Sequence, residues 1–396
     1  MTQPKVSIII VNWNGLEWLK VCLPSLAKVT YSNLEVIVVD NGSNDGSIEY
    51  LRSALLHPRG GHRQSHPAGD PDPSVPKIVT VIVENQTNLG FAYPNNQGID
   101  RATGEFILFL NNDMKYDPGF IEPLVAACQQ PGIGAAQPKM VRLDDPSRLD
   151  VVGSYLTVYG ILYHFGFGQA ANTPRYNQSR DIFSAKGAAL MVRTDVLEKT
   201  KLPLASVHLP VKEVATGDRL KHQPLTTGHY FDADYFAYFE ETDLCWRIWL
   251  AGYRIRYEPT ALVWHTGGAT AKRLNIFTHY HSFKNRLATL IKNLSFGSLS
   301  WMIPLHLIMI GLASLAYLMT GQLKVARATW RAVGWNLANL PATLAKRTHV
   351  QHHIRRRSDR QLWPIIHRPL PINYFYYLFT ARLEAWPTAR ALEEQA

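Results

Sequence analysis

The chain has 396 residues, of which 46% are hydrophobic and 18% are charged. This composition excludes a chain that is disordered throughout and suffices for one large domain or two modest ones. The formal net charge is +10, and residues 321–360 hold nine Lys or Arg but a single acid. Net charge alone does not distinguish nucleic acid, anionic lipid and anionic small molecules as partners.

The cysteines and the N-terminal segment bear on the cellular compartment. Cys22, Cys128 and Cys245 are scattered, without a C-x-x-C pair. We therefore expect small core residues in a reducing compartment rather than disulfides or a thiolate metal site. The apolar run 6–11 is too short for a secretory signal, so we expect the part of the chain that follows it to remain in the cytoplasm.

The first third of the chain alternates short apolar runs with amphipathic segments, which predicts a parallel sheet covered by helices. The expected strands are 6–11, 35–39, 78–83 and 106–110, and the expected helices are 16–27, a segment after the turn at 41–43, and 95–102. Residues 57–77 are rich in Pro, Gly, His and Ser, which indicates a surface insertion.

Beyond residue 130 the periodicity weakens. Residues 203–230 are predicted to form a loop near a binding surface, followed by a helix over 240–251 that Gly252 closes. Residues 293–323 contain no charged side chain. The part over 299–319 is long enough to cross a bilayer, but Pro304 and His306 make an interfacial helix a comparable alternative. A helical hairpin packed on the preceding part of the chain, or a dimer contact, is a further alternative.

Polar residues follow several of the predicted strands. Asn12 follows the first strand, Asp40 the second, and Asn111–Asn112–Asp113 the fourth. Ligands of doubly wound sheets bind beyond these strand ends, although a lone Asp there is as often a turn or a cap. Neither G-x-G-x-x-G after the first strand nor a P-loop occurs in the sequence. Any phosphate must therefore be neutralised in another way.

A divalent metal would serve that purpose, because Mg²⁺ and Mn²⁺ combine one or two carboxylates with phosphate oxygens. Asp113 at its strand end is suited to this role, and His265 after another apolar stretch could add an imidazole. Taken alone, a His after Trp is more often a packed residue than a ligand.

Acidic residues open the helix predicted over 240–251. Glu240, Glu241 and Asp243 could simply favour its positive N-terminus. Alternatively, the aromatic residues just upstream could desolvate one carboxylate and leave it poised as a general base.

Taken together, these segments resemble the family 2 glycosyltransferases, in particular the bacterial rhamnosyltransferase-like branch. The matching segments are VSIIIVNWNG, LEVIVVDNGSNDGS, NLGFAYPNNQGI, GEFILFLNNDM, KGAALMVRTDVL, FAYFEETDLCWRIWLAGYRIRY and VWHTGG. They occur in the family's order over about residues 5–270. The resemblance implies an α/β GT-A fold that uses a nucleotide-sugar donor and Mn²⁺ or Mg²⁺ and inverts the anomeric carbon.

It also implies a division of the chain. Residues 1–270 would be the GT-A catalytic domain, with about 1–115 binding the nucleotide-sugar in a Rossmann-like half and about 116–270 forming the acceptor half. Residues 271–396 would be a helical, membrane-associating and basic region.

Roles carry over to matching positions. Asp40 and Asn12 would bind the nucleoside, with the loop 88–96 lining the same pocket. The expected donor-binding set is Asn12, Asp40, Asn88, Gly90, Asn96, Asn111 and Asn112. Residues 111–113 occupy the family's D-x-D position, where Asn111 replaces the first Asp. The metal ligands would therefore be Asp113 and His265. Glu241 matches the catalytic base, where many relatives have Asp, and Asp243 is the fallback.

For the donor, resemblance alone points first to dTDP-rhamnose, then to UDP- or GDP-sugars. The acceptor would be a glycan or a lipid-linked molecule of cell-surface polysaccharide synthesis. The apolar and basic tail predicts contact with membrane lipid at the cytoplasmic face. No recognition fold for nucleic acid accompanies the basic tail, so we do not expect the protein to bind nucleic acid. Two alternatives remain: a catalytically silent GT-A-fold glycan-binding protein, which Asn111 favours, and a sugar-nucleotide nucleotidyltransferase, which lacks its signature here.

Overall fold

The parallel half of the sheet forms as expected. A computed structural model describes residues 3–55, 76, 78–203, 228–266 and 276–367. The first four strands are β1 (Val6–Asn12), β2 (Leu34–Asp40), β3 (Val81–Glu84) and β4 (Phe106–Asn111). They pair in parallel in the order β3-β2-β1-β4, so their carboxyl ends share one edge of the sheet.

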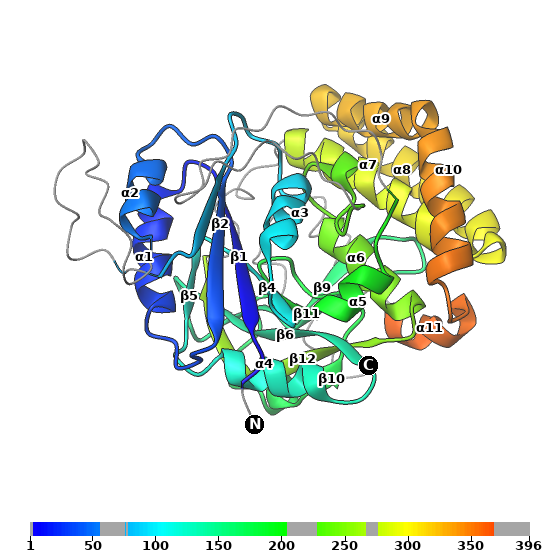
Figure 1. Ribbon diagram of the computed structural model, residues 1–396. Helices are drawn as coiled ribbons and strands as arrows, with labels where there is room; N and C mark the ends of the chain where they lie inside the picture. The colour runs from blue at the N-terminus through cyan, green and yellow to red at the C-terminus, as the bar shows by residue number, and fades with distance from the viewer. Residues whose placement is uncertain (1–2, 56–75, 77, 204–227, 267–275, 368–396) are drawn as a thin grey trace.

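Helices cover both faces of this half (Figure 1). They are α1 (Leu16–Leu26) and α2 (Ser47–Ser53) on one side and α3 (Ala92–Arg101) on the other. Ile8 and Ile10 of β1 join the core under α1, whereas Ile9 joins the core under α3. This alternation explains why the strands are continuously apolar. Helix α3 begins at Ala92, before the start at 95 that the sequence suggested.

The second half of the sheet is mixed. Beyond β4 follow β11 (Ala189–Arg193), β6 (Ile133–Arg142), β12 (Arg254–His265) and β10 (Arg180–Asp181), with β5 (Met114–Tyr116) on β12 and β7 (Leu149–Val151) on β6. A separate hairpin joins β8 (Gly153–Leu156) and β9 (Leu162–Phe165). Short helices are α4 (Ile121–Gln129), α5 (Thr194–Lys199) and α6 (Glu240–Leu250). The α/β class is therefore confirmed.

One pairing in this half positions the site. His265 at the end of β12 lies opposite Met114 at the start of β5. This register brings His265 beside Asp113, although the two residues are 152 positions apart in the printed numbering. Of the two irregular segments predicted from sequence, residues 56–75, 77 and 204–227 lie outside the described part of the chain.

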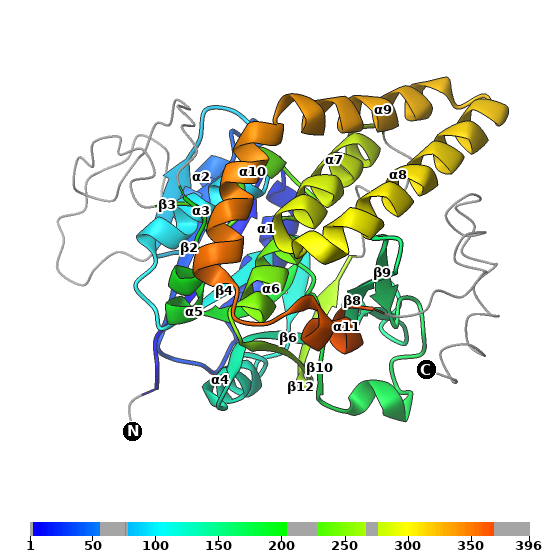
Figure 2. The same ribbon diagram turned by 90° about the vertical axis from the view of Figure 1, so that its right-hand side faces the viewer.

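The remainder of the described chain is helical. The helices are α7 (Ile276–Asn293), α8 (Phe296–Met319), α9 (Leu323–Ala338), α10 (Leu340–His349) and α11 (Asp359–Ile366), with a turn of π-helix over Val350–Ile354. Figure 2 shows α8 and α9 meeting at one end and extending to the side of the sheet domain. Among the described helices, α8 alone has the length and hydropathy to cross a membrane.

Candidate active site

The polar residues after β1, β2 and β4 meet at the sheet edge. The amide Nδ2 of Asn12 donates to Asp40 Oδ2 (2.9 Å), and Asn112 Nδ2 donates to Asn12 Oδ1 (2.7 Å). Asp40 also accepts the backbone N–H of Ser43 (2.8 Å). These bonds bring together three residues predicted to bind the donor and fix the loop that follows β2.

Asn41, which sequence reasoning passed over as turn chemistry, organises the next part of the edge. Its Nδ2 donates to Asn88 Oδ1 (2.8 Å) and to the carbonyl of Gly90 (2.7 Å). Its Oδ1 accepts the N–H of Leu89 (3.0 Å). The buried Asn41 therefore holds the predicted donor loop against the end of β2.

The same loop contacts the segment before α6. Gly90 has φ +87°, and a Cβ there would lie 2.2 Å from the carbonyl oxygen of Phe236, so only glycine fits. Asn96, expected to line the donor pocket, instead bonds the backbone at 230–231: its Oδ1 accepts both N–H groups, and its Nδ2 donates to Phe231 O. Its amide joins the two halves of the domain.

Asp113 and His265 form the centre of the site. Asp113 Oδ1 lies 3.3 Å from His265 Nε2 and has no hydrogen-bond partner, although it is buried. Asp113 Oδ2 accepts from Thr266 Oγ1 (2.5 Å). The other ring nitrogen of His265, Nδ1, bonds Asp150 Oδ2 (2.9 Å). A carboxylate behind the imidazole leaves Nε2 beside the unpartnered oxygen of Asp113, as in carboxylate–histidine–metal arrangements.

Electrostatics support the pairing of these groups. Burial alone would raise the pKa of Asp113, but His265 and Thr266 outweigh it and lower the pKa. Burial would likewise lower the pKa of His265, yet the carboxylates of Asp113 and Asp150 raise it. Within the described ranges, no group of three or more His, Cys, Asp or Glu side chains is placed to hold a metal. Asp113 and His265 thus suit a cation that takes its remaining ligands from phosphate and water.

Lys186, the first residue of the matching segment KGAALMVRTDVL, adds a positive charge to which the sequence analysis assigned no role. Its Nζ donates to Asp150 Oδ2 (2.6 Å), and its charge lowers the pKa of Asp113 and of Glu241. The backbone N–H of Lys186 donates to Gln137 Oε1 (2.8 Å), which fixes the segment before β11. The charge of this one ammonium group therefore acts on the carboxylates of the predicted metal site and on the predicted base.

Glu241 lies in the first turn of α6 and has the properties of a base. Burial raises the pKa of its carboxyl to about 7, although backbone N–H groups and Lys186 act in the opposite direction. A Cβ on Gly187 would lie 3.4 Å from the Cβ of Glu241 and 3.6 Å from the ring of Phe91. Glu241 is thus next to both the Lys186 segment and the donor loop.

The neighbouring Glu240 is more deeply buried. Burial, and then the charge of Glu241, raise its pKa well above the usual range. Its Oε2 atom has no hydrogen-bond partner. The raised pKa favours the protonated form of Glu240, so Glu241 is the carboxylate of this pair that ionises more readily.

The turn immediately before α6 has a strained backbone. Phe236, Tyr238 and Phe239 have φ values of +61°, +71° and +70°, a region that costs of order 1–3 kcal/mol for such residues. Asn285 of α7 supports the turn, because its Nδ2 lies within hydrogen-bond distance of the carbonyls of Tyr235, Ala237 and Tyr238. Strain held in this way is typical of positions where a side chain must point in one direction.

Asp243, the fallback base of the sequence analysis, lies instead in a buried ion-pair cluster. Its carboxylate is fully buried and forms ion pairs with Arg247 (3.0 Å) and Lys292 (3.0 Å). Asn293 Nδ2 also donates to it (2.8 Å). A carboxylate that is fully buried and paired with two cations is not accessible to an acceptor hydroxyl. The helix-dipole explanation is also incomplete, because two of the partners, Lys292 and Asn293, lie on α7.

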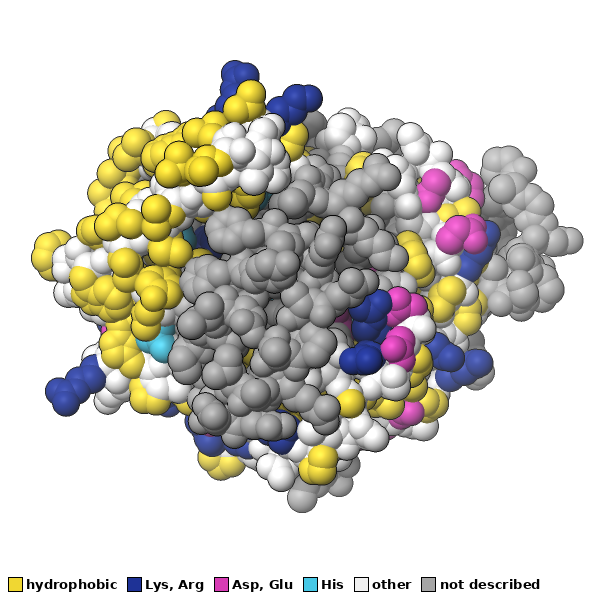
Figure 3. All heavy atoms as spheres, turned by 180° about the vertical axis from the view of Figure 1, so that it is seen from behind, with side chains coloured by type: hydrophobic (Ala, Val, Ile, Leu, Met, Phe, Trp, Pro, Cys, Tyr) yellow, Lys and Arg dark blue, Asp and Glu magenta, His cyan; other side chains and the backbone are white. Residues whose placement is uncertain are grey.

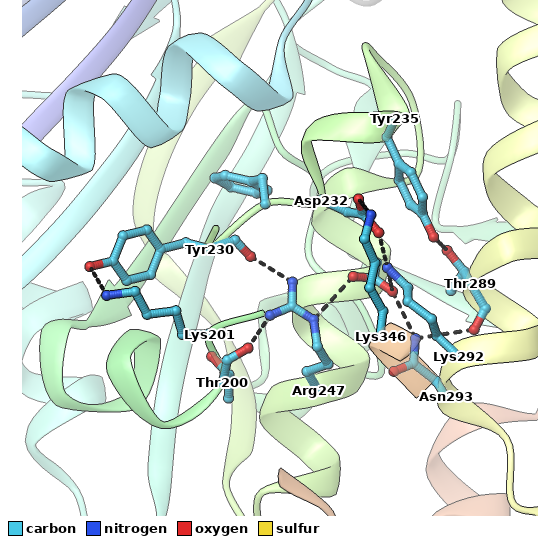
Figure 4. Close-up of polar contacts among 12 residues, drawn as sticks. Thr200, Lys201, Tyr230, Asp232, Tyr235, Arg247, Thr289, Lys292, Asn293 and Lys346 are labelled. Carbon is cyan, nitrogen blue, oxygen red and sulfur yellow. Dashed lines mark hydrogen bonds and ion pairs between the residues drawn. The ribbon is translucent and has the colours of Figure 1, made fainter. Parts of the chain in front are cut away.

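Asp243 belongs to a larger buried network, part of which Figure 4 shows. Asp232 pairs with Lys292 of α7 and with Lys346 of α10 (2.5 Å), and Lys346 also pairs with Asp234 (2.6 Å). These cations lower the pKa of Asp232 even though burial opposes them. The segment before the strained turn is thereby bound to two helices beyond residue 270.

Comparison with known proteins finds similarities to the first part of the chain. Residues 7–181 match the model of the family described as "Glycosyl transferase family 2". An uncharacterized glycosyltransferase of Escherichia coli, YibD, is 26% identical over 133 residues, which are 34% of this chain and 33% of that protein. The O-antigen biosynthesis protein RfbC of Myxococcus xanthus is 31% identical over 142 residues, 35% of this chain and 9% of RfbC. The chain therefore spans a third or less of these relatives.

Solved structures give a weaker likeness. A mannosyltransferase of Pyrobaculum calidifontis, in complex with GDP-Man and Mn²⁺, has a TM-score of 0.45 at 17% identity, over 85% of this chain and 88% of that chain. TarS 1–349 of S. aureus with UDP-GlcNAc has a TM-score of 0.47 at 16% identity, over 83% and 81%. Such values are too low to assign a donor or a metal to this protein.

Proposed function

Because residues 7–181 match the model of glycosyltransferase family 2, we propose that the protein transfers a sugar from a nucleoside diphosphate sugar to an acceptor hydroxyl, with inversion. The observation that carries the proposal is the placement of Glu241. A carboxyl whose pKa is raised to about 7 lies near Lys186, which in turn bonds the carboxylate behind His265. This arrangement supports a base at Glu241 close to the residues that would accommodate a leaving diphosphate.

The donor would bind along the strand ends. Asp40 and Asn12 would take the nucleoside, and the loop at Asn88–Gly90 would close over it with Asn41 as its support. Asn111 and Asn112 would line the same edge near the phosphates, where neutral amides can donate hydrogen bonds to phosphate oxygens. This arrangement uses polar side chains where other nucleotide sites use a glycine-rich loop.

Mn²⁺ or Mg²⁺ would be held by Asp113 and His265. The unpartnered Oδ1 of Asp113 beside Nε2 of His265 is the donor set that supports this assignment. Such an ion supplies Lewis-acid stabilisation of the charge on the leaving diphosphate. Asp150 would keep the imidazole oriented through Nδ1, and Lys186 would add a fixed positive charge next to the site.

Glu241 would act on the acceptor. A hydroxyl is a weak nucleophile at neutral pH, so the ionised carboxylate takes its proton as the oxygen attacks C1. The new bond forms between the acceptor oxygen and C1 while the bond from C1 to the phosphate oxygen breaks. The electron pair leaves with the nucleoside diphosphate. In-line attack on the face opposite the leaving group inverts C1, and Glu241 releases its proton to solvent afterwards.

We propose a rhamnosyl or hexosyl donor and a glycan or lipid-linked acceptor, with the protein acting at the cytoplasmic face of a membrane. Support for a lipid-linked acceptor comes from α8, a helix of 24 residues with a mean hydropathy of 1.9 in its most apolar window. The names of relatives such as an O-antigen biosynthesis protein agree with cell-surface polysaccharides as the product class.

Thermal-shift measurements against a panel of nucleotide sugars, with and without Mn²⁺, test the proposal. We expect one donor to stabilise the protein, and the same donor to be hydrolysed slowly without acceptor. A protein that binds glycans but neither binds nor hydrolyses any donor would instead be the catalytically silent form that Asn111 favours.

A further inference from the structure

A helix on the surface of a soluble protein buries its apolar face and exposes its polar face. In α8 this distribution is reversed. Its buried residues recur every fourth position and include polar side chains at Ser298, His306 and Ser314. Its outward face is apolar: Ile308, Leu312 and Leu315 are more than half exposed, at 59%, 56% and 54%. Exposed apolar patches of this extent mark an interaction surface.

Helix α9 continues this surface and adds charge to it. Leu323, Trp330 and Leu337 recur every seventh residue and are exposed, so they form one apolar stripe. Lys324 and Arg331, each one position further along, are exposed beside that stripe. No Asp or Glu occurs from residue 293 to residue 358. Figure 3 shows hydrophobic side chains gathered over this part of the molecule, with Lys and Arg at its edge.

A basic, apolar face of this kind suits a leaflet with anionic headgroups better than a protein partner. Each exposed Lys or Arg near such a surface contributes about 1 kcal/mol, and buried apolar groups contribute about 0.8 kcal/mol per methylene. Trp301 and Trp330 are exposed on the face, and tryptophan is enriched at the level of the headgroups.

The contacts of α8 decide how it meets the bilayer. His306 Nδ1 bonds the carbonyl of Tyr159 (2.6 Å), which lies between β8 and β9, and Ser314 Oγ accepts from Trp330 Nε1 (2.9 Å) on α9. The start of α8 is tied to α11, where Asp359 accepts the N–H of Ser295 (2.7 Å). One side of α8 is therefore attached to the protein over most of its length.

This attachment is incompatible with crossing. If α8 ran through the bilayer, the β8–β9 turn and the cations of α9 would enter hydrocarbon with it, at roughly 2.5–3.5 kcal/mol for each charge. We propose that α8 and α9 lie in the plane of one leaflet, with the apolar stripes in the lipid and Lys324 and Arg331 at the anionic headgroups. The inference deepens the proposed membrane location, and it places both ends of α8 on one side of the bilayer.

Vesicle flotation tests the lipid contact. The full chain should float with vesicles of phosphatidylcholine and phosphatidylglycerol, and the double variant Leu312→Glu/Leu315→Glu should lose roughly tenfold or more of the bound fraction, because two apolar side chains become charged. Val21→Glu changes an apolar site on α1 that is also exposed, at 41%, and this control variant should bind normally. Equal flotation of the double variant and the wild type would overturn the proposal.

Thiol labelling tests the in-plane geometry. The double variant Ser300→Cys/Thr320→Cys places thiols at exposed positions near both ends of α8, and the native Cys22, Cys128 and Cys245 are buried. The variant is reconstituted into sealed vesicles, treated with a membrane-impermeant maleimide, and weighed by intact mass spectrometry. We expect molecules with two labels or none, according to orientation, and two labels in all molecules after detergent. One label per molecule, or no label in any molecule before detergent, would overturn the proposal.

Donor hydrolysis measured in detergent separates this inference from the proposed function. If the Leu312→Glu/Leu315→Glu variant hydrolyses donor like the wild type but fails to float, both proposals stand. If no donor is hydrolysed by any form and flotation still follows the prediction, only the proposed function fails. If donor is hydrolysed but the labelling shows one thiol on each side, only the in-plane geometry fails.

Discussion

Replacing Glu241 by Gln tests the central residue of the site. Gln keeps the size and hydrogen bonding of the side chain but cannot accept the acceptor's proton, so we expect turnover to fall roughly a hundredfold or more, the usual scale for losing a general base. Because the pKa of Glu241 is raised to about 7, the wild-type rate should also depend on pH. One unit below that pKa only about a tenth of the molecules carry the ionised base.

The assay is kcat against pH at saturating donor, acceptor and Mn²⁺. The wild type should show an acid limb near pH 7 that falls about tenfold per unit, and Glu241→Gln should lack it. Protonation of His265 could also weaken metal binding at low pH, but that limb would move when the Mn²⁺ concentration is raised, whereas the limb of Glu241 would not. Glu49→Gln, an exposed acid on α2, is the control and should leave the profile unchanged.

Stability gives an independent readout of the same residue. The pKa of Glu241 is raised in the folded state, from 4.5 to about 7, so ionisation destabilises the folded protein as pH rises through this window. Relative to wild type, Glu241→Gln should gain stability between these pH values, by at most about 3 kcal/mol. A variant with more than a tenth of wild-type turnover, an unchanged acid limb and no such gain would refute the assignment of the base.

Further predictions concern Lys186, the metal site and the buried ion pairs of Lys292. Lys186→Met should move the acid limb to higher pH, because the Lys186 charge lowers the pKa of Glu241, and Lys186→Arg should restore it in part, as kcat against pH would show. Asp113→Asn should abolish the Mn²⁺-dependent thermal shift with donor while leaving the melting temperature without ligand nearly unchanged; a full Mn²⁺ response would contradict the metal assignment. Lys292→Met should cost about 3–5 kcal/mol in urea unfolding, because Asp232 and Asp243 lose a buried cation, whereas the exposed Lys199→Met should cost little. Since the pKa of Asp232 is lowered, the stability from that pair should also be lost as pH falls below the ordinary Asp value of 3.8.

The parallel half could be predicted from sequence because its strands are buried on both faces. A run such as 6–11 must then be apolar throughout, and Asn12 and Asp40 mark where burial ends. The start of α3 was predicted less accurately. The sequence analysis placed it at residue 95, but the helix begins at Ala92, because Pro94 is tolerated in a first helical turn. Local chemistry therefore sufficed for the order of elements and for the strand-end residues.

The residues that sequence reasoning missed are those whose role depends on distant partners. Asp150 acts through His265, which is far away in the chain, and Lys186 acts through Asp150. Nothing in the local pattern around either residue indicates this. Asp243 shows the opposite error: its place in an acidic helix start suggested a base, but Lys292 on α7 turns it into a structural ion pair.

The support that Asn285 and Lys346 give to the segment at 232–238 has a practical consequence for anyone who wants a soluble enzyme. Cutting the chain at about residue 270 would remove Asn285 from beneath the strained turn and both cations from Asp232, so the base would lose its fixed direction. Even a cut after α7 would remove Lys346. Water solubility is better sought by substituting polar residues for the exposed apolar residues of α8. Such substitutions leave the contacts of Asn285, Lys292 and Lys346 intact.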